Sequence, residues 1–355
     1  PREPIEVRQI DKQRSEPRRC LLFPRGRPTH PGTTPSEGIG QPRQMYRFDR
    51  HRHILAAPLR QVHSVQFTGL HSPVHVQMRA ALRHSDATCR SNGTLYGSLS
   101  RTESWERSRM KAILIAAGMG RRLSPYTDDR PKCMVEVAGR PMILRQIDNL
   151  RAVGVTDFVV IRGYLADRLT SALASEPGVR FVDNFDYANN NILLSLMCAA
   201  EELSSGFFCS YGDIVYRPEV SATLAQSQEE LGLVVDPFFA QVYEGRTEHP
   251  IAEAELTDVR DGLVRQVGKK AVPLEQAAGE FIGLWRASAR AGQVLRELFA
   301  QRLSERGLSS PYGRAARLQV AYLTDLFNDL IAEEPRLQLP IHSVEIARPQ
   351  SWREI

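Results

Sequence analysis

The sequence has few cysteines, and none of them shows a metal-binding or redox spacing. Its 355 residues include five cysteines, with no Cys-x-x-Cys pair and no paired histidine spacing beside them. This pattern is typical of reduced thiols in a cytoplasmic protein. No apolar run approaches the roughly 18 residues that a membrane span requires, and no cleavable secretory leader is visible. We therefore expect a cytoplasmic protein that does not enter a membrane.

Lysine is nearly absent from the first 109 residues, which contain Lys12 alone beside 18 arginines. This segment holds 19 Lys and Arg against 9 Asp and Glu, whereas residues 110–355 hold 27 against 32. The net charge of +5 therefore comes from the leading segment. Because the segment lacks a sustained helical or strand period, we predict that it builds no hydrophobic core.

Three interpretations of residues 1–109 are open. A basic tail would attract nucleic acid or an anionic membrane, but without a known module or interleaved aromatic residues we do not expect nucleic acid as a partner. A transit-like leader fits poorly with the acidic residues and prolines. We favour upstream sequence that lies outside the native protein, because the chain starts at Pro1 and Met110 precedes the first good strand.

The most informative stretch runs from Met110 to Pro141. Its apolar residues 112–117 are typical of a buried parallel strand. Gly118 and Gly120 follow at once, and free amides at such a turn before a helix form an anion site. Three basic side chains come next: Arg121, Arg122 and Lys132. The stretch predicts a loop that wraps a polyphosphate, although it is neither a Walker A loop nor a dinucleotide fingerprint.

Beyond this loop, strand-like and helix-like segments alternate along the chain. The predicted strands are 112–117, 157–161, 179–182, 207–211, 231–235 and 337–346, and the predicted helices are 141–153, 166–174, 192–203, 218–228, 290–306 and 321–333. This alternation predicts an α/β fold with a doubly wound, mostly parallel, Rossmann-like sheet that binds ligands at the carboxyl ends of its strands.

A β-hairpin is predicted from the alternation in residues 252–259 and 263–267, which flank Asp261-Gly262. We expect it to form a small lid that closes over the cleft.

Asp213 follows Gly212 directly after the predicted strand 207–211. A carboxylate at the end of a central strand suits magnesium, which usually takes one or two carboxylates together with phosphate oxygens. The alternative interpretation is that Asp213 caps the helix near residues 218–228.

The string Gly118-x-Gly120-x-Arg122-Leu123-x-Pro125-x-Thr127-x-x-x-Pro131-Lys132 resembles the signature of the nucleotidyltransferases that join a nucleoside monophosphate to a phosphorylated small molecule. Other strings are similar to the phosphocholine and 2-aminoethylphosphonate cytidylyltransferase branch: the asparagine segment 184–196, Tyr-x-Gly-Arg-Thr-x-His-Pro at 243–250, Glu-Ala-Glu at 253–255, Gly-Lys at 268–269 and Gly-Glu-Phe-Ile-Gly-Leu at 279–284.

The resemblance implies transfer of CMP from CTP to a small phosphorylated or phosphonylated amine, with Mg²⁺ and release of pyrophosphate. It implies nucleotide binding by Ala117, Gly118, Met119, Gly120 and Arg121, catalytic roles for Arg122 and Lys132, magnesium binding by Asp213, and acceptor binding by Tyr187, Asn190, Ser195, Arg246, Glu255, Lys269 and Glu280. Helix capping by Asn189 or Asn190, and solvation of Glu255 or Glu280, are the structural alternatives. A homodimer is compatible with the sequence.

Two other functions are open. A sugar-1-phosphate nucleotidylyltransferase with UTP or dTTP as donor would share the glycine loop, Lys132 and Asp213, although no hexapeptide repeats follow the domain. A nucleotide-binding regulatory protein that has lost catalysis would differ at position 356, where an aspartate would indicate an enzyme.

The carboxyl end generates the first testable prediction. In the resembled family, the pattern Trp-x-Glu-Ile-Asp-Thr supplies a second metal-binding aspartate, and this sequence stops at Ile355, one residue before it. We predict that the chain as written is poorly active, because one carboxylate holds magnesium weakly. Extension through Asp-Thr should restore turnover with CTP and magnesium, and equal turnover by the two proteins would contradict the prediction.

Overall fold

A single mixed sheet positions the other elements. The structure is a computed structural model that describes residues 18–19, 110–246 and 249–355. In the leading segment it describes only β1 (Arg18–Arg19), which pairs in parallel with β6 (Val179–Asp183). The other expectations for residues 1–109 fall outside the described residues.

The first half of the sheet is parallel, as predicted. Its strands lie in the order β6, β5 (Phe158–Arg162), β2 (Lys111–Ala116) and β7 (Phe207–Tyr211), and all neighbours are parallel. Every residue of β2 after Lys111 is buried, and alternate side chains enter two different core clusters. Both faces of the strand are therefore covered, which explains its continuous apolar run.

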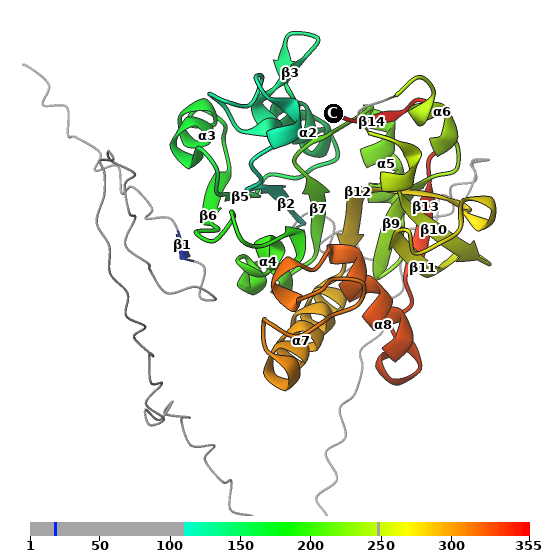
Figure 1. The fold of residues 1–355 in the computed structure, drawn as a ribbon. Helices are drawn as coiled ribbons and strands as arrows, with labels where there is room; N and C mark the ends of the chain where they lie inside the picture. Colours follow the sequence, from blue (N-terminus) through cyan, green and yellow to red (C-terminus); the bar gives the residue numbers. More distant parts are fainter. Residues whose placement is uncertain (1–17, 20–109, 247–248) are drawn as a thin grey trace, which may run out of the picture. The chain divides into compact units, whose positions relative to one another are not determined.

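Helices cover both faces of the sheet, which confirms the doubly wound arrangement. The core cluster on one face includes side chains of α2 (Met142–Ala152), α3 (Ala166–Ala172) and α5 (Pro218–Gln226). The other face carries α4 (Ile192–Met197), α7 (Ala289–Arg306) and α8 (Leu323–Leu337) (Figure 1). The helix predicted at 192–203 is too long, because Ala199 leaves helical geometry before a short 3-10 helix, Ala200–Ser204.

The prediction of a mostly parallel sheet is wrong for the second half. This half contains β9 (Leu231–Asp236), β10 (Glu255–Arg260), β11 (Leu263–Lys269), β12 (Gly279–Ala287) and β13 (His342–Glu345). Only β13 and β9 are parallel neighbours there, and the pairing of β12 with both β10 and β9 closes the five strands into a ring. Parallel neighbours need a crossover connection, whereas two residues join β10 to β11.

The predicted hairpin exists, but it is not a lid. Asp261 and Gly262 turn it with φ values of 53° and 74°, as a tight two-residue turn requires. The turn lies beside β13, because Ser343 donates to the Gly262 carbonyl at 2.9 Å. Val264 and Val267 are buried in the same core cluster as α8. The hairpin is therefore a fixed wall of the domain.

Several short elements escaped prediction. Strand β8 (Ile214–Tyr216) pairs antiparallel with β14 (Trp352–Glu354), and α6 (Phe239–Tyr243) follows β9. The strand predicted at 337–346 is shorter, because α8 continues through Leu337. The remaining short elements are β3 (Glu136–Val137), β4 (Arg140–Pro141) and the 3-10 helices Arg121–Leu123, Lys132–Met134, Ile251–Glu253, Leu274–Gln276 and Leu318–Val320.

Within the described residues, no helix has the length and apolar character needed to cross a membrane.

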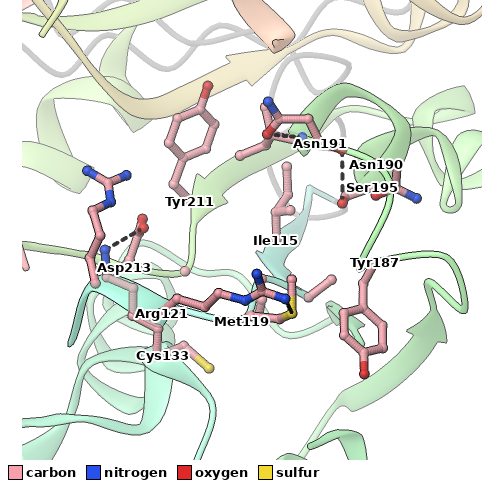
Figure 2. Close-up of a pocket in the computed structure, with 18 residues that line it drawn as sticks. Ile115, Met119, Arg121, Cys133, Tyr187, Asn190, Asn191, Ser195, Tyr211 and Asp213 are labelled. Atoms are coloured by element: carbon pink, nitrogen blue, oxygen red, sulfur yellow. Dashed lines mark hydrogen bonds and ion pairs between the residues drawn. The ribbon is translucent and has the colours of Figure 1, made fainter. Parts of the chain in front are cut away.

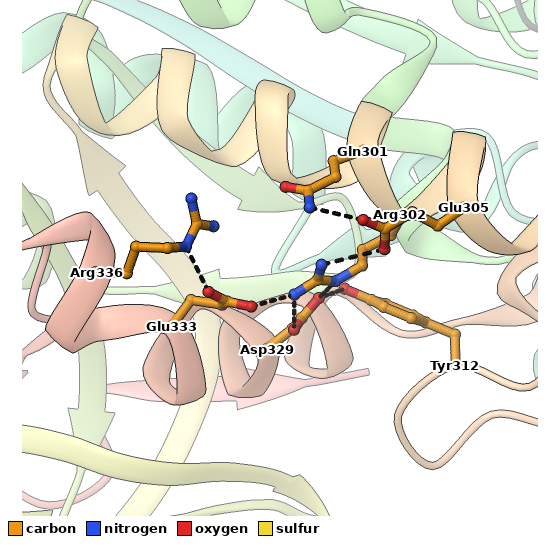
Figure 3. Close-up of polar contacts among 7 residues, drawn as sticks. All are labelled: Gln301, Arg302, Glu305, Tyr312, Asp329, Glu333 and Arg336. Atoms are coloured by element: carbon orange, nitrogen blue, oxygen red, sulfur yellow. Dashed lines mark hydrogen bonds and ion pairs between the residues drawn. The ribbon is translucent and has the colours of Figure 1, made fainter.

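Helices α7 and α8 are joined by an ionic network around Arg302 (Figure 3). The Arg302 guanidinium donates to Asp329 at 2.8 and 3.0 Å and to Glu333 at 2.6 Å. The Tyr312 hydroxyl also donates to Asp329, at 2.8 Å.

We predict that Arg302→Ala lowers the free energy of unfolding by about 2 kcal/mol, because it leaves the largely buried Asp329 carboxylate without its cation. Urea unfolding measures this loss. The matched control is Arg336→Ala, since Arg336 is 57% exposed and pairs with the same Glu333; it should leave the unfolding midpoint almost unchanged. Equal effects of the two substitutions would contradict the prediction.

Candidate functional site

The loop after β2 presents unpaired backbone donors. The amides of Gly118, Met119 and Gly120 donate to no acceptor in the described part of the chain. Gly120 has φ 60°, and a Cβ there would lie 2.8 Å from the Lys132 Cβ, so glycine is needed for this close approach. The Thr127 hydroxyl donates to the Gly120 carbonyl at 3.0 Å and closes the loop. Such a row of free amides suits an anion.

This loop borders the first of two joined cavities, which we call the loop cavity. It has a volume of about 380 Å³. Figure 2 shows Tyr187, Asn190 and Ser195 at one side of it and Asp213 at the other. The predicted residues that line it are Ala117, Gly118, Met119, Gly120, Arg121, Arg122, Lys132, Tyr187, Asn190, Ser195 and Asp213.

Lys132 and Asp213 form an ion pair across the floor of the loop cavity. The Lys132 Nζ lies 3.0 Å from Asp213 Oδ2, and the two side chains are 17% and 31% exposed. The turn before Asp213 crosses β2 closely, because a Cβ on Gly212 would lie 2.7 Å from the Ile115 carbonyl oxygen. Asp213 does not cap α5, whose N-cap residue is Arg217. The capping interpretation of Asp213 is therefore wrong.

The Asp213 carboxylate can supply one magnesium ligand, but it cannot enclose the ion by itself. The described residues contain no group of three or more His, Cys, Asp or Glu that could enclose a metal ion. The Asp213 carboxylate nevertheless faces the loop cavity from the end of a central strand. Magnesium usually takes one or two carboxylates and completes its shell with phosphate oxygens and water. The residues present fit an ion that arrives with a phosphorylated ligand.

A buried asparagine orders the polar side of the loop cavity. The Asn184 amide donates to Asn190 Oδ1 at 3.0 Å and to the Ser195 hydroxyl at 2.9 Å. Asn190 donates back to Asn184 Oδ1 at 2.9 Å. The cap of α4 is Asn191, which accepts from the Ile192 amide at 2.9 Å. The expectation of a cap at Asn189 or Asn190 is therefore wrong by one or two residues.

The second cavity, which we call the acidic cavity, has a volume of about 160 Å³. Arg122, Tyr211 and Asp213 line both cavities, so the two meet at the Lys132–Asp213 pair. The predicted Glu255, Lys269 and Glu280 line the acidic cavity, together with Glu253 and Glu354 and the aromatic residues Tyr211, Phe281, Tyr322 and Trp352. Five carboxylates, counting Asp213, therefore line this cavity together with two cations, Arg122 and Lys269.

Burial changes the charge of two of these carboxylates. Desolvation raises the pKa of Glu255 to about 7, partly offset by Lys269. Desolvation likewise raises the pKa of Glu280 to about 8, despite a hydrogen bond from the Tyr243 hydroxyl at 2.6 Å. Glu280 Oε2 is buried and has no hydrogen-bond partner in the described part of the chain. Both groups lie ready to accept a cation or a donor.

His249 connects the two cavities. Its Nδ1 lies 3.0 Å from an Arg122 guanidinium nitrogen, and its Nε2 lies 3.3 Å from Glu354 Oε2. Arginine only donates, so Nδ1 must accept and the imidazole proton sits on Nε2, toward Glu354. Although burial alone would raise the pKa of Glu354, the His249 hydrogen bond and the charge of Lys132 hold it at about 2.

Arg246 is the one predicted acceptor residue that lines neither cavity. Its guanidinium donates to the Glu354 carbonyl and lies over the Tyr243 ring, so it holds β14 in place. The expectation that Arg246 contacts the acceptor is therefore not supported. Sequence reasoning missed Glu354 and Trp352 as lining residues, because a three-residue strand at the end of the chain gives no periodic signal.

Comparisons with known proteins agree with this geometry. Residues 112–279 match the family model of the MobA-like NTP transferase domain. CTP:phosphoglutamine cytidylyltransferase of Campylobacter jejuni is 34% identical over 197 residues, which cover 54% of this chain and 77% of that protein. Choline-phosphate cytidylyltransferase of Streptococcus pneumoniae is 38% identical over 108 residues, which cover 30% of this chain and 47% of the relative.

Solved structures show the same fold. The CTP:phosphocholine cytidylyltransferase of Streptococcus pneumoniae superposes with a TM-score of 0.50 at 24% identity, over 70% of this chain and 93% of that one. The inositol-1-phosphate CTP transferase of T. maritima gives a TM-score of 0.52 at 18% identity, over 70% and 89%.

We predict that His249→Gln weakens CTP binding about tenfold. The longer glutamine amide would reach Glu354 but would no longer accept the hydrogen bond from Arg122, so the guanidinium would not be held beside the nucleotide phosphates. His249→Asn places an acceptor where Nδ1 lies, and it should keep the affinity within about threefold of the original protein. Titration of CTP into each variant measures the difference. If the two variants bind CTP equally, His249 does not position Arg122.

Proposed function

Because the chain belongs to the nucleotidyltransferase family with a MobA-like NTP transferase domain, we propose that it transfers CMP from CTP to a small phosphorylated or phosphonylated amine. The observation that carries this proposal is the junction of the two cavities at Lys132 and Asp213. One cavity offers free amides and basic side chains, and the other offers buried carboxylates and aromatic rings.

In the proposed reaction, a phosphate or phosphonate oxygen of the acceptor attacks the α-phosphorus of CTP. A new P–O bond forms, the bond to the β-phosphate breaks, and pyrophosphate leaves. Both reactants are anionic, so the protein's task is alignment and charge stabilisation. The amides of Gly118 to Gly120 and the Arg122 guanidinium would hold the β and γ phosphates. The Lys132 ammonium would move from Asp213 to the α-phosphate, where negative charge increases in the transition state.

Asp213 would hold magnesium, and the ion would supply Lewis acidity toward the phosphates. The Lys132 ammonium lies 3.0 Å from the Asp213 carboxylate. Release of this contact would free both groups for the substrates at the same moment.

The acidic cavity favours an acceptor that carries a positive charge. Glu280 is 2% exposed and Glu255 is 8% exposed, and both tend to stay protonated near neutral pH. A cation bound near them would stabilise their ionised forms. The names of the relatives list phosphoglutamine, choline phosphate and 2-aminoethylphosphonate as acceptors, and each of these carries an amine or ammonium group.

A sugar 1-phosphate acceptor is the second candidate. Protonated Glu255 and Glu280 can also hydrogen-bond to neutral hydroxyls. A mannose-1-phosphate guanyltransferase of Aspergillus oryzae is 48% identical over 64 residues, which cover 18% of this chain and 18% of that protein. This match is short, and it does not extend over the acidic residues of the second cavity together with the glycine loop.

A pyrophosphate-release screen tests the proposal. Four nucleoside triphosphates are combined with phosphocholine, 2-aminoethylphosphonate, phosphoglutamine and several sugar 1-phosphates, with and without magnesium. We predict release with CTP and one of the amines, and a loss of at least about 100-fold on Lys132→Met, because electrostatic stabilisation of the transition state is lost. Release with sugar 1-phosphates alone would reject the amine acceptor.

In the same screen, Glu280→Gln distinguishes binding of the amine from binding of CTP. The amide keeps the shape but cannot ionise when a cation binds, so the KM for the amine should rise about tenfold while the KM for CTP stays nearly constant. Glu219→Gln is the matched control, because Glu219 is an exposed residue of α5 outside both cavities. Equal effects on the two KM values would show that Glu280 has only a structural role.

A further inference from the structure

A third cavity, lined by four arginines, lies at the junction of α2, α5 and the β8–β14 pair. It has a volume of about 330 Å³, and we call it the arginine cavity. The arginines are Arg140, Arg145, Arg217 and Arg353, and Asp148 is the only carboxylate among the lining residues. Residues 110–355 as a whole hold more acidic than basic residues, so the accumulation of positive charge is local.

Most of this positive charge is not neutralised by carboxylates. Arg145 donates to the carbonyl oxygens of Val137 and Ala138, and Arg353 donates to the Val242 carbonyl at 2.7 Å. Carbonyl oxygens fix the guanidinium groups without cancelling their charge. Of the four, Arg140 alone has an acidic partner among the described residues, Asp148 at 2.7 Å. The cavity therefore keeps a net charge of about +3, since its single carboxylate compensates one of the four guanidinium groups.

A helix terminus adds to the positive potential of the cavity. The nine-residue helix α5 begins at Pro218 in the cavity wall, and its N-cap residue Arg217 makes no side-chain cap. The partial positive charge of the helix terminus adds to that of the arginines.

We propose that the arginine cavity binds a multiply charged phosphate anion, such as inorganic phosphate or pyrophosphate, at a site separate from the two joined cavities. Arginine is suited to this ligand, because its planar fork pairs with two phosphate oxygens at once. The proposal does not depend on the identity of the acceptor or of the nucleotide.

The bound anion would act on the candidate active site through β14. Adjacent residues of a strand point to opposite faces. Arg353 lines the arginine cavity, and the next residue, Glu354, lines the acidic cavity and lies 3.3 Å from His249 Nε2. The following residue, Ile355, donates its amide to the Asp213 carbonyl at 3.1 Å. An anion that clamps Arg353 and Arg217 would hold β14 against β8 and steady these contacts.

Equilibrium dialysis with labelled pyrophosphate tests the proposal on the full chain without divalent ions. Arg217→Glu is the informative variant, because Arg217 is exposed and its side chain has no ion pair with any described residue. Arg265→Glu is the matched control, since Arg265 is exposed on β11 and lines none of the three cavities. Lys132→Met marks binding in the loop cavity. Parallel dialysis with inorganic phosphate distinguishes the two anions.

We expect Arg217→Glu to weaken one class of pyrophosphate sites at least about tenfold, because charge reversal replaces attraction of the anion by repulsion. Arg265→Glu should leave that class within about twofold, and Lys132→Met should leave it intact. The proposal is overturned if the two charge reversals act equally, if Lys132→Met abolishes all binding, or if neither anion binds. Loss of CTP turnover alone would concern only the proposed function.

Discussion

The ion pair between Lys132 and Asp213 is the contact on which the candidate site depends. It joins the loop after β2 to the turn after β7, at the carboxyl ends of two parallel neighbours. Parallel strands bring both turns to the same edge of the sheet. The pair neutralises two partly buried charges, and Asp213 lies where the loop cavity and the acidic cavity meet. A phosphorylated ligand and its cation can replace each partner with a group of the same sign.

The two cavities differ in the charged and polar groups that line them. The loop cavity offers backbone donors that have no acceptor among the described residues, which suits an anion. In the acidic cavity, burial raises the pKa of Glu255 and Glu280 toward neutrality and so favours their uncharged, protonated forms. Glu354 stays ionised between them, since His249 and the nearby lysines stabilise it. This division supports the proposal of an acceptor with a phosphate at one end and a cationic group at the other.

Much of this arrangement was predictable from the sequence where the signal was local. The apolar run of β2, the glycines after it and the Gly212-Asp213 turn identified the loop cavity, because each feature lies within a few residues of the chain. The acidic cavity was predictable only through the resemblance that singled out Glu255, Lys269 and Glu280. Pairings between distant segments determine the ring of strands, the role of the hairpin as a wall and the position of β14. Such pairings leave no pattern in the sequence of either paired segment.

The central claim is that the junction of the two cavities joins the α-phosphate of CTP to a phosphorylated amine. Incubation with CTP labelled at the α-phosphorus tests it most directly. The account predicts that the label appears in a diphosphate-linked product with the amine acceptor, and that Asp213→Asn abolishes its formation. Label that stays in CTP, or that appears in CMP alone, with every amine tested would contradict the account.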